Sequence, residues 1–280
     1  MKLSVHIILV CMFMANVSCQ DDYADRSDNP GLLVVEGGID SGGYVQVLLT
    51  SSIVPEAGGG TLDDCMIRWG KVTVCDGSKT VVLTGGPQNG YIPPYTYYSY
   101  DMIGEPGKTY TLTAEYDGKK VTSVSTMPVP TPISRLDCAP TDTPGMYSVT
   151  LYFESPDDCP AYYHISTRLI GEDSHLYPAI LGTVEVNTPG IEISVPVYRG
   201  KHFGSAKEFS PLWPKGAEVK VVLERVSRQV YDFWTAYNDD VLFGGSQFVG
   251  SASDLPSNIN GGLGVWSARG VSSGMILVGE

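Results

Sequence analysis

The chain is poor in basic residues, in histidine and in long apolar runs. It has 18 lysines and arginines against 31 aspartates and glutamates in 280 residues, so its net charge at pH 7 is −13. Binding to nucleic acid needs basic side chains that neutralise phosphates, and this composition therefore argues against a nucleic-acid partner. The four histidines show no spacing typical of metal ligands, so we expect neither a metal site nor a cofactor.

One apolar run lies near the N-terminus, at residues 5–14. A membrane-spanning helix needs about 20 apolar residues, so this run is too short to cross a bilayer. With Lys2 before it, the run is typical of a secretory signal peptide. We therefore expect residues 1–18 to be removed, which deletes one lysine and no acid and changes the net charge from −13 to −14.

The residues that follow this run predict where the protein is located. Residues 17–19 read Val-Ser-Cys and resemble a bacterial lipobox, although Asn16 stands where lipoboxes usually carry leucine. We expect Cys19 to carry lipid, because two or more acyl chains anchor a protein stably in a membrane. Ordinary secretion with an incidental cysteine is the alternative.

Residues 19–30 are expected to form an acidic tether. Four aspartates stand there against one arginine, and such a segment stays solvated rather than collapsing. The segment also resembles the acidic export signal that directs lipoproteins of Bacteroidota to the cell surface. The expected location is therefore the outer membrane, with the folded part exposed on the cell surface and held by its lipid anchor.

Glycine, proline and tyrosine are frequent, with 32, 19 and 17 residues, and the β-branched runs are short. This composition is typical of mainly β proteins with turns rich in glycine and proline. We predict two β-sandwich-like domains of the immunoglobulin or fibronectin type, at residues 31–127 and 134–280. The proline-rich residues 128–133 are expected to be an extended, semi-rigid linker.

Residue periodicity supports this division. Residues 109–116 alternate strictly between apolar and polar, and Asp117–Gly118 then predicts a hairpin turn. The period changes near residues 228–243, where four apolar or aromatic residues are spaced i, i+3, i+4 and i+7 after a possible cap at Ser227. This spacing predicts one short helix in the second domain.

Four cysteines remain after the signal peptide and the anchor: Cys65, Cys75, Cys138 and Cys159. An even number in an exported protein suggests disulfides. Sequence order favours the pairs Cys65–Cys75 and Cys138–Cys159, each inside one predicted domain. Zinc binding is the weaker alternative, because no two cysteines have the C-x-x-C spacing.

An ordered series of segments along the chain resembles a family of Bacteroidota surface lipoproteins catalogued as a domain of unknown function. The series runs through residues 33–37, 107–112, the proline-rich linker and Asn258–Trp266. The resemblance implies an immunoglobulin-like N-terminal sandwich joined to a second β-rich domain. It also implies a frequent association with TonB-dependent outer-membrane transporters, and it carries over no catalytic residue.

No pattern in the chain predicts an enzyme. Gly270–Gly274 matches G-x-S-x-G, but that motif needs a histidine downstream and none follows. Acidic pairs such as Asp157–Asp158 lack the spacing of a calcium loop and are expected to be solvated. Asn258–Trp266 is interpreted as a structural turn whose tryptophan fills the core.

The most unusual stretch is residues 91–101, which contains Tyr91, Tyr95, Tyr97, Tyr98 and Tyr100. Tyrosine combines an apolar face with a polar tip and suits ligand or protein interfaces. These tyrosines are therefore a candidate surface for a glycan, a peptide or a transporter. An equally weighted interpretation is that they pack on the core of their own domain.

Taken together, the patterns favour a non-enzymatic, lipid-anchored surface protein that binds a ligand and assists a TonB-dependent nutrient transporter. The alternative is an adhesin or a pilus-associated structural subunit, which would need a removable edge strand for strand exchange.

Overall fold

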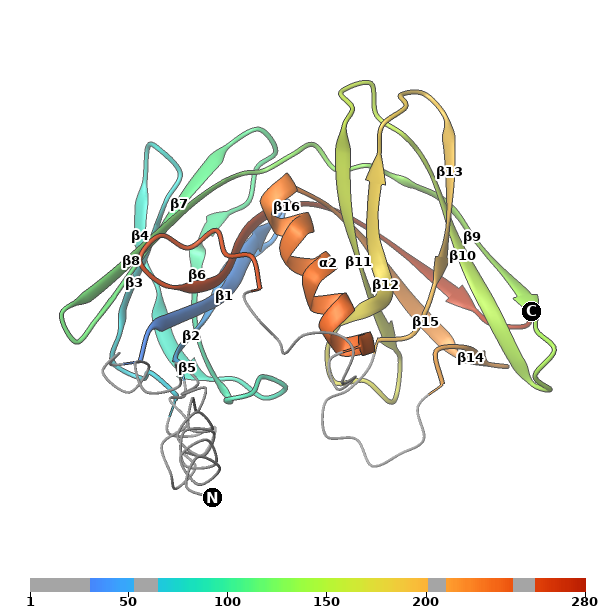
Figure 1. Ribbon diagram of the computed structural model, residues 1–280, viewed down its shortest axis with the longest axis horizontal. Helices are drawn as coiled ribbons and strands as arrows, with labels where there is room; N and C mark the ends of the chain where they lie inside the picture. Colours follow the sequence, from blue (N-terminus) through green and yellow to red (C-terminus); the bar gives the residue numbers. More distant parts are fainter. Residues whose placement is uncertain (1–30, 53–64, 201–209, 244–254) are drawn as a thin grey trace, which may run out of the picture.

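The computed structural model describes residues 31–52, 65–200, 210–243 and 255–280. These residues form two β-rich lobes that lie side by side and share one sheet (Figure 1). The mainly β fold with one helix in the described residues is as predicted. The first lobe contains β1 (Leu33–Asp40), β2 (Tyr44–Ser51), β3 (Lys71–Cys75), β4 (Thr80–Val82), β5 (Thr84–Pro87), β6 (Tyr95–Ile103), β7 (Thr109–Tyr116) and β8 (Lys119–Thr126).

The second lobe follows the proline-rich segment. It contains β9 (Ile133–Pro140), β10 (Met146–Glu154), β11 (Ala161–Leu169), β12 (Tyr177–Val186), β13 (Glu192–Val197), β14 (Trp213–Pro214), β15 (Glu218–Val226), helix α2 (Arg228–Phe243) and β16 (Leu263–Leu277). Each lobe has a smaller sheet of its own, with the order β4-β3-β7-β8 in the first and β13-β10-β14 with β9 beside β10 in the second.

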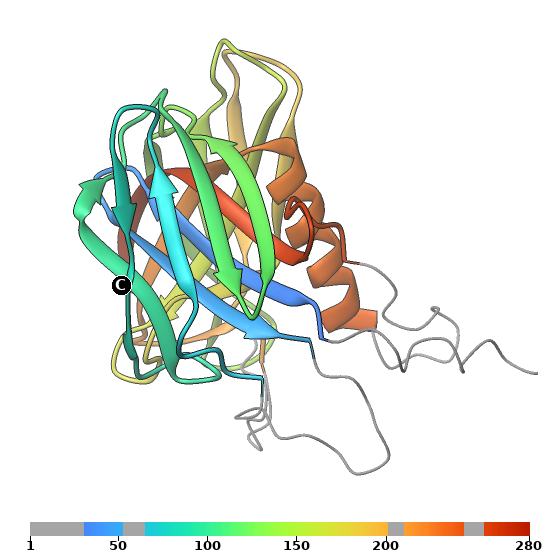
Figure 2. The same ribbon diagram turned by 90° about the vertical axis from the view of Figure 1, so that its left-hand side faces the viewer.

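An eight-stranded sheet with the order β12-β11-β15-β16-β1-β2-β6-β5 runs through both lobes. Strand β16 joins the two parts, because its residues 263–269 pair parallel with β1 and its residues 270–277 pair antiparallel with β15. Figure 2 shows the smaller sheet of the first lobe lying across this shared sheet. The two lobes are therefore continuous through hydrogen-bonded backbone.

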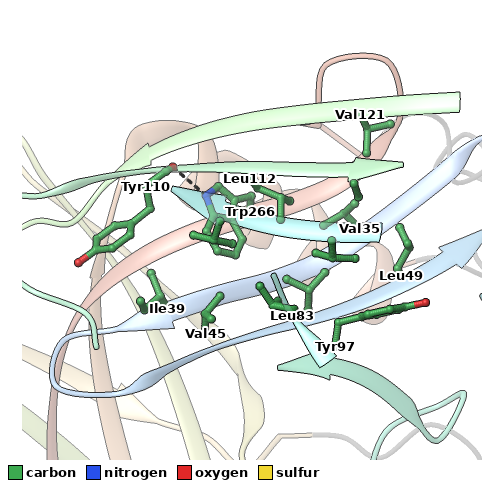
Figure 3. Close-up of a cluster of buried hydrophobic side chains, with 14 of the residues drawn as sticks. Val35, Ile39, Val45, Leu49, Leu83, Tyr97, Tyr110, Leu112, Val121 and Trp266 are labelled. Atoms are coloured by element: carbon green, nitrogen blue, oxygen red, sulfur yellow. Dashed lines mark hydrogen bonds between the residues drawn. The ribbon is translucent and has the colours of Figure 1, made fainter. Parts of the chain in front are cut away.

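The core of the first lobe is built around Trp266, which is fully buried (Figure 3). Its indole Nε1 donates a hydrogen bond of 3.1 Å to the carbonyl oxygen of Tyr110. The nearby Gly264 has a φ of +104°, and a Cβ there would lie 1.9 Å from the carbonyl oxygen of Val35. Only glycine fits such a position, so the structural interpretation of Asn258–Trp266 is confirmed.

The second core contains another buried tryptophan, Trp213, whose Nε1 donates a hydrogen bond of 2.8 Å to the carbonyl oxygen of Val197. Phe153 and Tyr163 pack in the same core with their ring centroids 4.8 Å apart. In both cores the N–H of the buried indole donates a hydrogen bond to a backbone carbonyl, and buried tryptophans usually have such a partner.

The hairpin turn and the helix form where the sequence predicts them. Asp117 and Gly118 both have positive φ, 49° and 72°, as a two-residue type I′ turn needs. Helix α2 begins after Ser227, whose hydroxyl oxygen accepts a hydrogen bond of 3.4 Å from the backbone N–H of Val230. Among the residues described, no helix has the length and apolarity that crossing a bilayer requires.

The C-terminal segment differs from the predicted domain division. Ile259, Trp266 and Ala268 lie in the core of the first lobe, although the sequence division places them in the second. The proline-rich residues 128–133 also pack against the folded lobes. Thr131 is buried, and its carbonyl oxygen accepts a hydrogen bond of 2.6 Å from the Ser272 hydroxyl on β16. The reason is that β16 passes between the lobes and that the linker lies against it.

The four cysteines form no disulfide in the described residues, so the predicted pairs are corrected. Cys138 lies opposite Val149 on β10, whereas Cys159 comes after the far end of that strand at Glu154. The five residue steps from Val149 to Glu154 span about 16 Å, at roughly 3.3 Å per strand residue. The two Cα atoms of a disulfide lie within about 7 Å of each other, so this separation does not allow the Cys138–Cys159 pair.

The first predicted pair fails for a related reason. The carbonyl oxygen of Cys65 accepts a hydrogen bond from Ser51 at the end of β2, in the shared sheet. Cys75 ends β3 opposite Thr111, in the smaller sheet. Proximity in sequence therefore did not bring the two thiols together, because they belong to different layers.

Candidate functional site

One face of the shared sheet packs against helix α2 through an apolar cluster that includes Val226 and Val265, and it carries polar side chains beside that contact. This face lies on the side away from both smaller sheets (Figure 1). Side chains alternate along a strand, so every second residue of β1, β2, β11, β15 and β16 reaches this face. We call it the helix face and define it by these residues: Glu36, Gly38, Asp40, Gln46, His164, Ser166, Glu224, Val265, Ser267 and Arg269.

A buried hydrogen-bonded group occupies the part of the helix face on β11 and β15. His164 Nδ1 lies 2.9 Å from Glu224 Oε2, and the Ser166 hydroxyl donates to Glu224 Oε1 at 3.2 Å. The imidazole is stacked on Trp234 of helix α2, with ring centroids 4.3 Å apart. Burial alone raises the pKa of Glu224, but the charge of Arg269 and the contacts of His164 and Ser166 outweigh it and lower the pKa to about 2.

This group contains a serine, a histidine and a carboxylate, but not in the geometry of a catalytic triad. A triad needs the nucleophile at the histidine Nε2 and the carboxylate at Nδ1. Here Ser166 bonds the carboxylate instead, and His164 Nε2 is buried without a hydrogen-bond partner among the described residues. The ionised Glu224 accepts hydrogen bonds only, so His164 carries its proton on Nδ1.

A cation lies at the centre of the helix face. The Nε of Arg269 donates to Asp40 Oδ1 at 2.5 Å, and one of its terminal nitrogens lies 4.0 Å from Glu224 Oε2. Burial lowers the pKa of Arg269, but the negative charges of Asp40 and Glu224 outweigh this effect and raise the pKa above its ordinary value. The guanidinium also lies close to Gly38, where a Cβ would meet Arg269 Cζ at 3.5 Å and the carbonyl oxygen of Ser267 at 2.4 Å.

Two polar groups near this cation have no hydrogen-bond partner among the described residues. Glu36 makes no hydrogen bond or ion pair with a described residue. Solvent reaches the Glu36 side chain, but the surrounding protein removes part of its hydration. This partial loss of water raises the pKa of Glu36, and the positive charge of Arg269 lowers that pKa by less. On β16, the buried Ser267 hydroxyl, opposite Gly38 and therefore two positions further along this face than Glu36, has no hydrogen-bond partner in the described residues.

Helix α2 closes one side of this region. Burial raises the pKa of Tyr237 to about 12, and the charges of Glu36 and Asp240 add to the shift. The Tyr237 hydroxyl therefore stays protonated near the Glu36 carboxylate. On the same helix, the side-chain nitrogen of the buried Asn238 also has no hydrogen-bond partner among the described residues.

Loops from the two lobes meet at the opposite side. The Tyr91 hydroxyl donates to Gln46 Oε1 at 3.1 Å, and its ring is stacked on His175 with centroids 6.1 Å apart. A Cβ on Gly90 would lie 3.1 Å from His175 Nδ1, so the two loops are in close contact. Tyr91 comes from the first lobe and His175 from the second, and both are separate from the β1–β16 junction in sequence.

The tyrosine-rich stretch is divided between the two interpretations. Tyr95 and Tyr97 pack on the first core, and the Tyr97 hydroxyl donates to the carbonyl oxygen of Ile67 at 2.8 Å. Tyr98 and Tyr100 lie on β6 with ring centroids 5.4 Å apart, and Tyr100 is 69% exposed. Tyr44 on β2 extends this pair, with its ring centroid 4.9 Å from that of Tyr100.

Several other sequence predictions cannot be placed. Cys19, His202 and the acidic pair Asp63–Asp64 lie outside the described residues. Within the described ranges, no group of three or more histidine, cysteine or acidic residues is arranged to hold a metal.

Sequence reasoning missed most of the helix face, although it includes a usable signal. Glu36 and Asp40 stand at alternate positions of an otherwise apolar strand, as do Ser267 and Arg269 in β16. A polar position repeating every second residue beside buried ones indicates a strand with two unlike faces. The pairing of β1 with β16, about 230 residues apart in sequence, is what brings these positions together.

No curated protein matches the chain. A chain from a solved structure titled "Cytokine receptor complex - Crystal form 1A" shares 10% identity, with 70% of this chain and 86% of that chain covered and a TM-score of 0.24. Residues 21–274 match the family described as Domain of unknown function (DUF4249). The chain belongs to this DUF4249 family.

Proposed function

We propose that this protein binds a ligand without converting it, on the helix face, and that it does so at the cell surface as an accessory of a TonB-dependent nutrient transporter. The Val-Ser-Cys sequence that ends at Cys19 supports a lipid anchor, and the acidic tether supports export to the surface. Transporter association is supported by the resemblance described above.

The observation that carries the binding proposal is that Glu36 and Ser267, two positions apart along the same face of β1 and β16, both lack a hydrogen-bond partner among the described residues. A buried hydroxyl without a partner costs about 1–3 kcal/mol, so proteins rarely keep one without a use. Glu36 is a carboxylate without an ion-pair partner among the described residues although Arg269 stands nearby. A ligand with a positively charged or hydrogen-bond-donating group would satisfy both.

The absence of a nucleophile at His164 Nε2 within the described residues supports binding rather than hydrolysis. Tyr91 and His175 hold the two lobes together beside the same face, which favours a preformed site. Preformed sites lose less conformational freedom on binding and therefore gain affinity.

The first experiment is a gentle affinity purification from native outer membranes, read by mass spectrometry. Wild-type protein is expected to recover a transporter barrel in a fixed ratio, and Cys19→Ala is expected to leave the membrane fraction and lose that barrel. Recovery of the lipidated protein alone would contradict the accessory role and favour the adhesin alternative.

The ligand part of the proposal has a separate readout. Small molecules that copurify with wild-type protein are identified by mass spectrometry and compared with those from Glu36→Gln and from Lys79→Gln, an exposed lysine away from the helix face. A compound retained by wild type and Lys79→Gln but lost from Glu36→Gln supports the helix face as the site. Equal retention by all three variants would place binding elsewhere.

A further inference from the structure

A second candidate site lies on the first lobe, on the smaller sheet and away from the helix face. Trp69 is 88% exposed and is separated from the first residue of β3 only by Gly70. It borders an open hollow of about 460 Å³, together with Lys71 and residues 115–120 of the β7–β8 hairpin. We call this hollow the Trp69 pocket. Its volume lies within the range of roughly 300–1,000 Å³ that small-molecule sites occupy.

The backbone that carries Trp69 is fixed in place on both sides. The Tyr97 hydroxyl donates to the carbonyl oxygen of Ile67 at 2.8 Å and accepts a hydrogen bond of 2.9 Å from the N–H of Gly70. The Tyr95 hydroxyl donates to the carbonyl oxygen of Arg68 at 3.2 Å. The hydrogen bonds of Tyr95 and Tyr97 therefore fix the backbone of residues 67–70. The exposed position of the indole is thus preorganised by the fold.

Charged groups of both signs line the same hollow as the indole. The Glu115 carboxylate lies between two lysines, 3.4 Å from Lys120 Nζ and 3.9 Å from Lys71 Nζ. Their positions follow from register, because Glu115 pairs with Lys71 on β3 and with Lys120 on β8. The Lys119 amine donates to the carbonyl oxygen of Gly31, just before β1, at 2.7 Å.

This combination selects one class of ligand. A single exposed indole is too small to be the large apolar patch that marks a membrane or protein interface. The charges of the pocket nearly balance, which gives no preference for a strongly anionic or cationic partner. A sugar ring has an apolar face of C–H groups that stacks on an aromatic ring and a rim of hydroxyls that bond to carboxylates and amines.

We propose that the Trp69 pocket binds a neutral pyranose ring of a carbohydrate. The ring stacks on the Trp69 indole, and its hydroxyls bond to Glu115 and Lys120. This site is separate from the helix face, so the proposal goes beyond the function proposed above and does not depend on the lipid anchor or on a transporter.

The test is affinity electrophoresis of the full chain carrying Cys19→Ala, in gels containing dextran, xylan, mannan or laminarin. We expect at least one of these neutral polysaccharides to retard the protein, and Trp69→Ala to weaken that affinity about tenfold or more, which equals about 1.4 kcal/mol. Met275→Ala, which removes a half-exposed apolar side chain from the second lobe, is the control and is expected to migrate as the parent protein.

Glu115→Gln separates hydrogen bonding from stacking and is expected to weaken binding less than Trp69→Ala. Because Trp69 is exposed, its removal is expected to leave thermal unfolding almost unchanged, so lost binding cannot be attributed to misfolding. No retardation by any of the four polysaccharides would overturn the proposal. So would equal retardation of the parent and Trp69→Ala, or Trp69-dependent flotation with vesicles of phosphatidylethanolamine and phosphatidylglycerol.

Discussion

The two faces of the shared sheet are built by the same strands and have opposite chemistry. On β1 and β16, Val35, Ile39 and Trp266 fill the first core, while the alternate residues Glu36, Ser267 and Arg269 form the helix face. The core face is closed by a second sheet of the same lobe. Among the described residues, helix α2 and the loops that carry Tyr91 and His175 lie on the helix face, which keeps polar atoms without hydrogen-bond partners.

This difference separates what holds the protein together from what is available for binding. Substitutions on the core face are expected to cost stability whatever they do to function. Substitutions on the helix face are expected to have smaller effects, and in one case an effect of opposite sign. Each prediction below tests that distinction.

The largest effect is expected from Trp266→Ala. Truncation of a fully buried tryptophan leaves a cavity and an unpaired Tyr110 carbonyl, so we expect a loss of about 3–5 kcal/mol in the free energy of unfolding. Urea denaturation followed by circular dichroism measures it. Because β16 pairs in both lobes, both should melt at lower urea concentration, and a loss under about 1.5 kcal/mol would contradict the assignment of Trp266 as a core residue.

The next largest loss of stability is expected from Glu224→Gln, and the size of this loss depends on pH. Because the folded pKa is about 2 and the ordinary value is 4.5, the ionised carboxylate contributes about 3 kcal/mol above pH 4.5, and this contribution is lost as pH falls towards 2. The variant is expected to be less stable at pH 7 and to lose this pH dependence. Stability measured between pH 2 and 7 tests it, and the exposed Asp158→Asn, which removes the partner of Arg225, is the control.

Gly38→Ala tests the close approach of β1 and β16 at the centre of the helix face. The new Cβ would lie 2.4 Å from the backbone carbonyl oxygen of Ser267, which cannot move without separating the strands. Overpacking of this kind costs about 1–3 kcal/mol. The expected thermal shift is downward. Gly86→Ala is the control, because a Cβ there would meet only the Tyr98 ring, at 3.4 Å or more. A Gly38→Ala variant as stable as wild type would show that the two strands tolerate separation there.

The smallest effect is expected from Glu36→Gln, and its sign is the informative part. Partial loss of water raises the folded pKa of Glu36, so its ionised form destabilises the fold increasingly as pH rises through 4.5. Glutamine stays neutral, and the variant is therefore expected to gain up to about 0.5 kcal/mol at pH 7, a change typical of accessible positions. Differential scanning calorimetry at pH 7 and pH 4 checks this. A destabilised variant at pH 7 would indicate that Glu36 has a structural partner and would weaken the binding proposal.

Local sequence patterns predicted single elements well. The alternation of residues 109–116, the Asp117–Gly118 turn and the helix after Ser227 depend on neighbours only a few residues away. Strands β9 and β12 were not predicted, because β9 begins inside the proline-rich segment and β12 lacks clear alternation. The disulfide pairs failed because sequence separation does not indicate which sheet a cysteine joins.

By itself the sequence determined the mainly β class, the position of the helix, the acidic character of the chain and the Cys19 pattern that predicts a lipid anchor. The tertiary structure alone decided that β16 joins the two lobes, that Glu36, Ser267 and Arg269 share one face of the shared sheet, and that the Tyr95 and Tyr97 hydroxyls bond to the backbone beside Trp69. The physical reason is the distance along the sequence between the residues that make contact. Turns and helices are fixed by contacts within a few residues, whereas the two faces of a sheet acquire their neighbours from strands that pair across more than 200 residues.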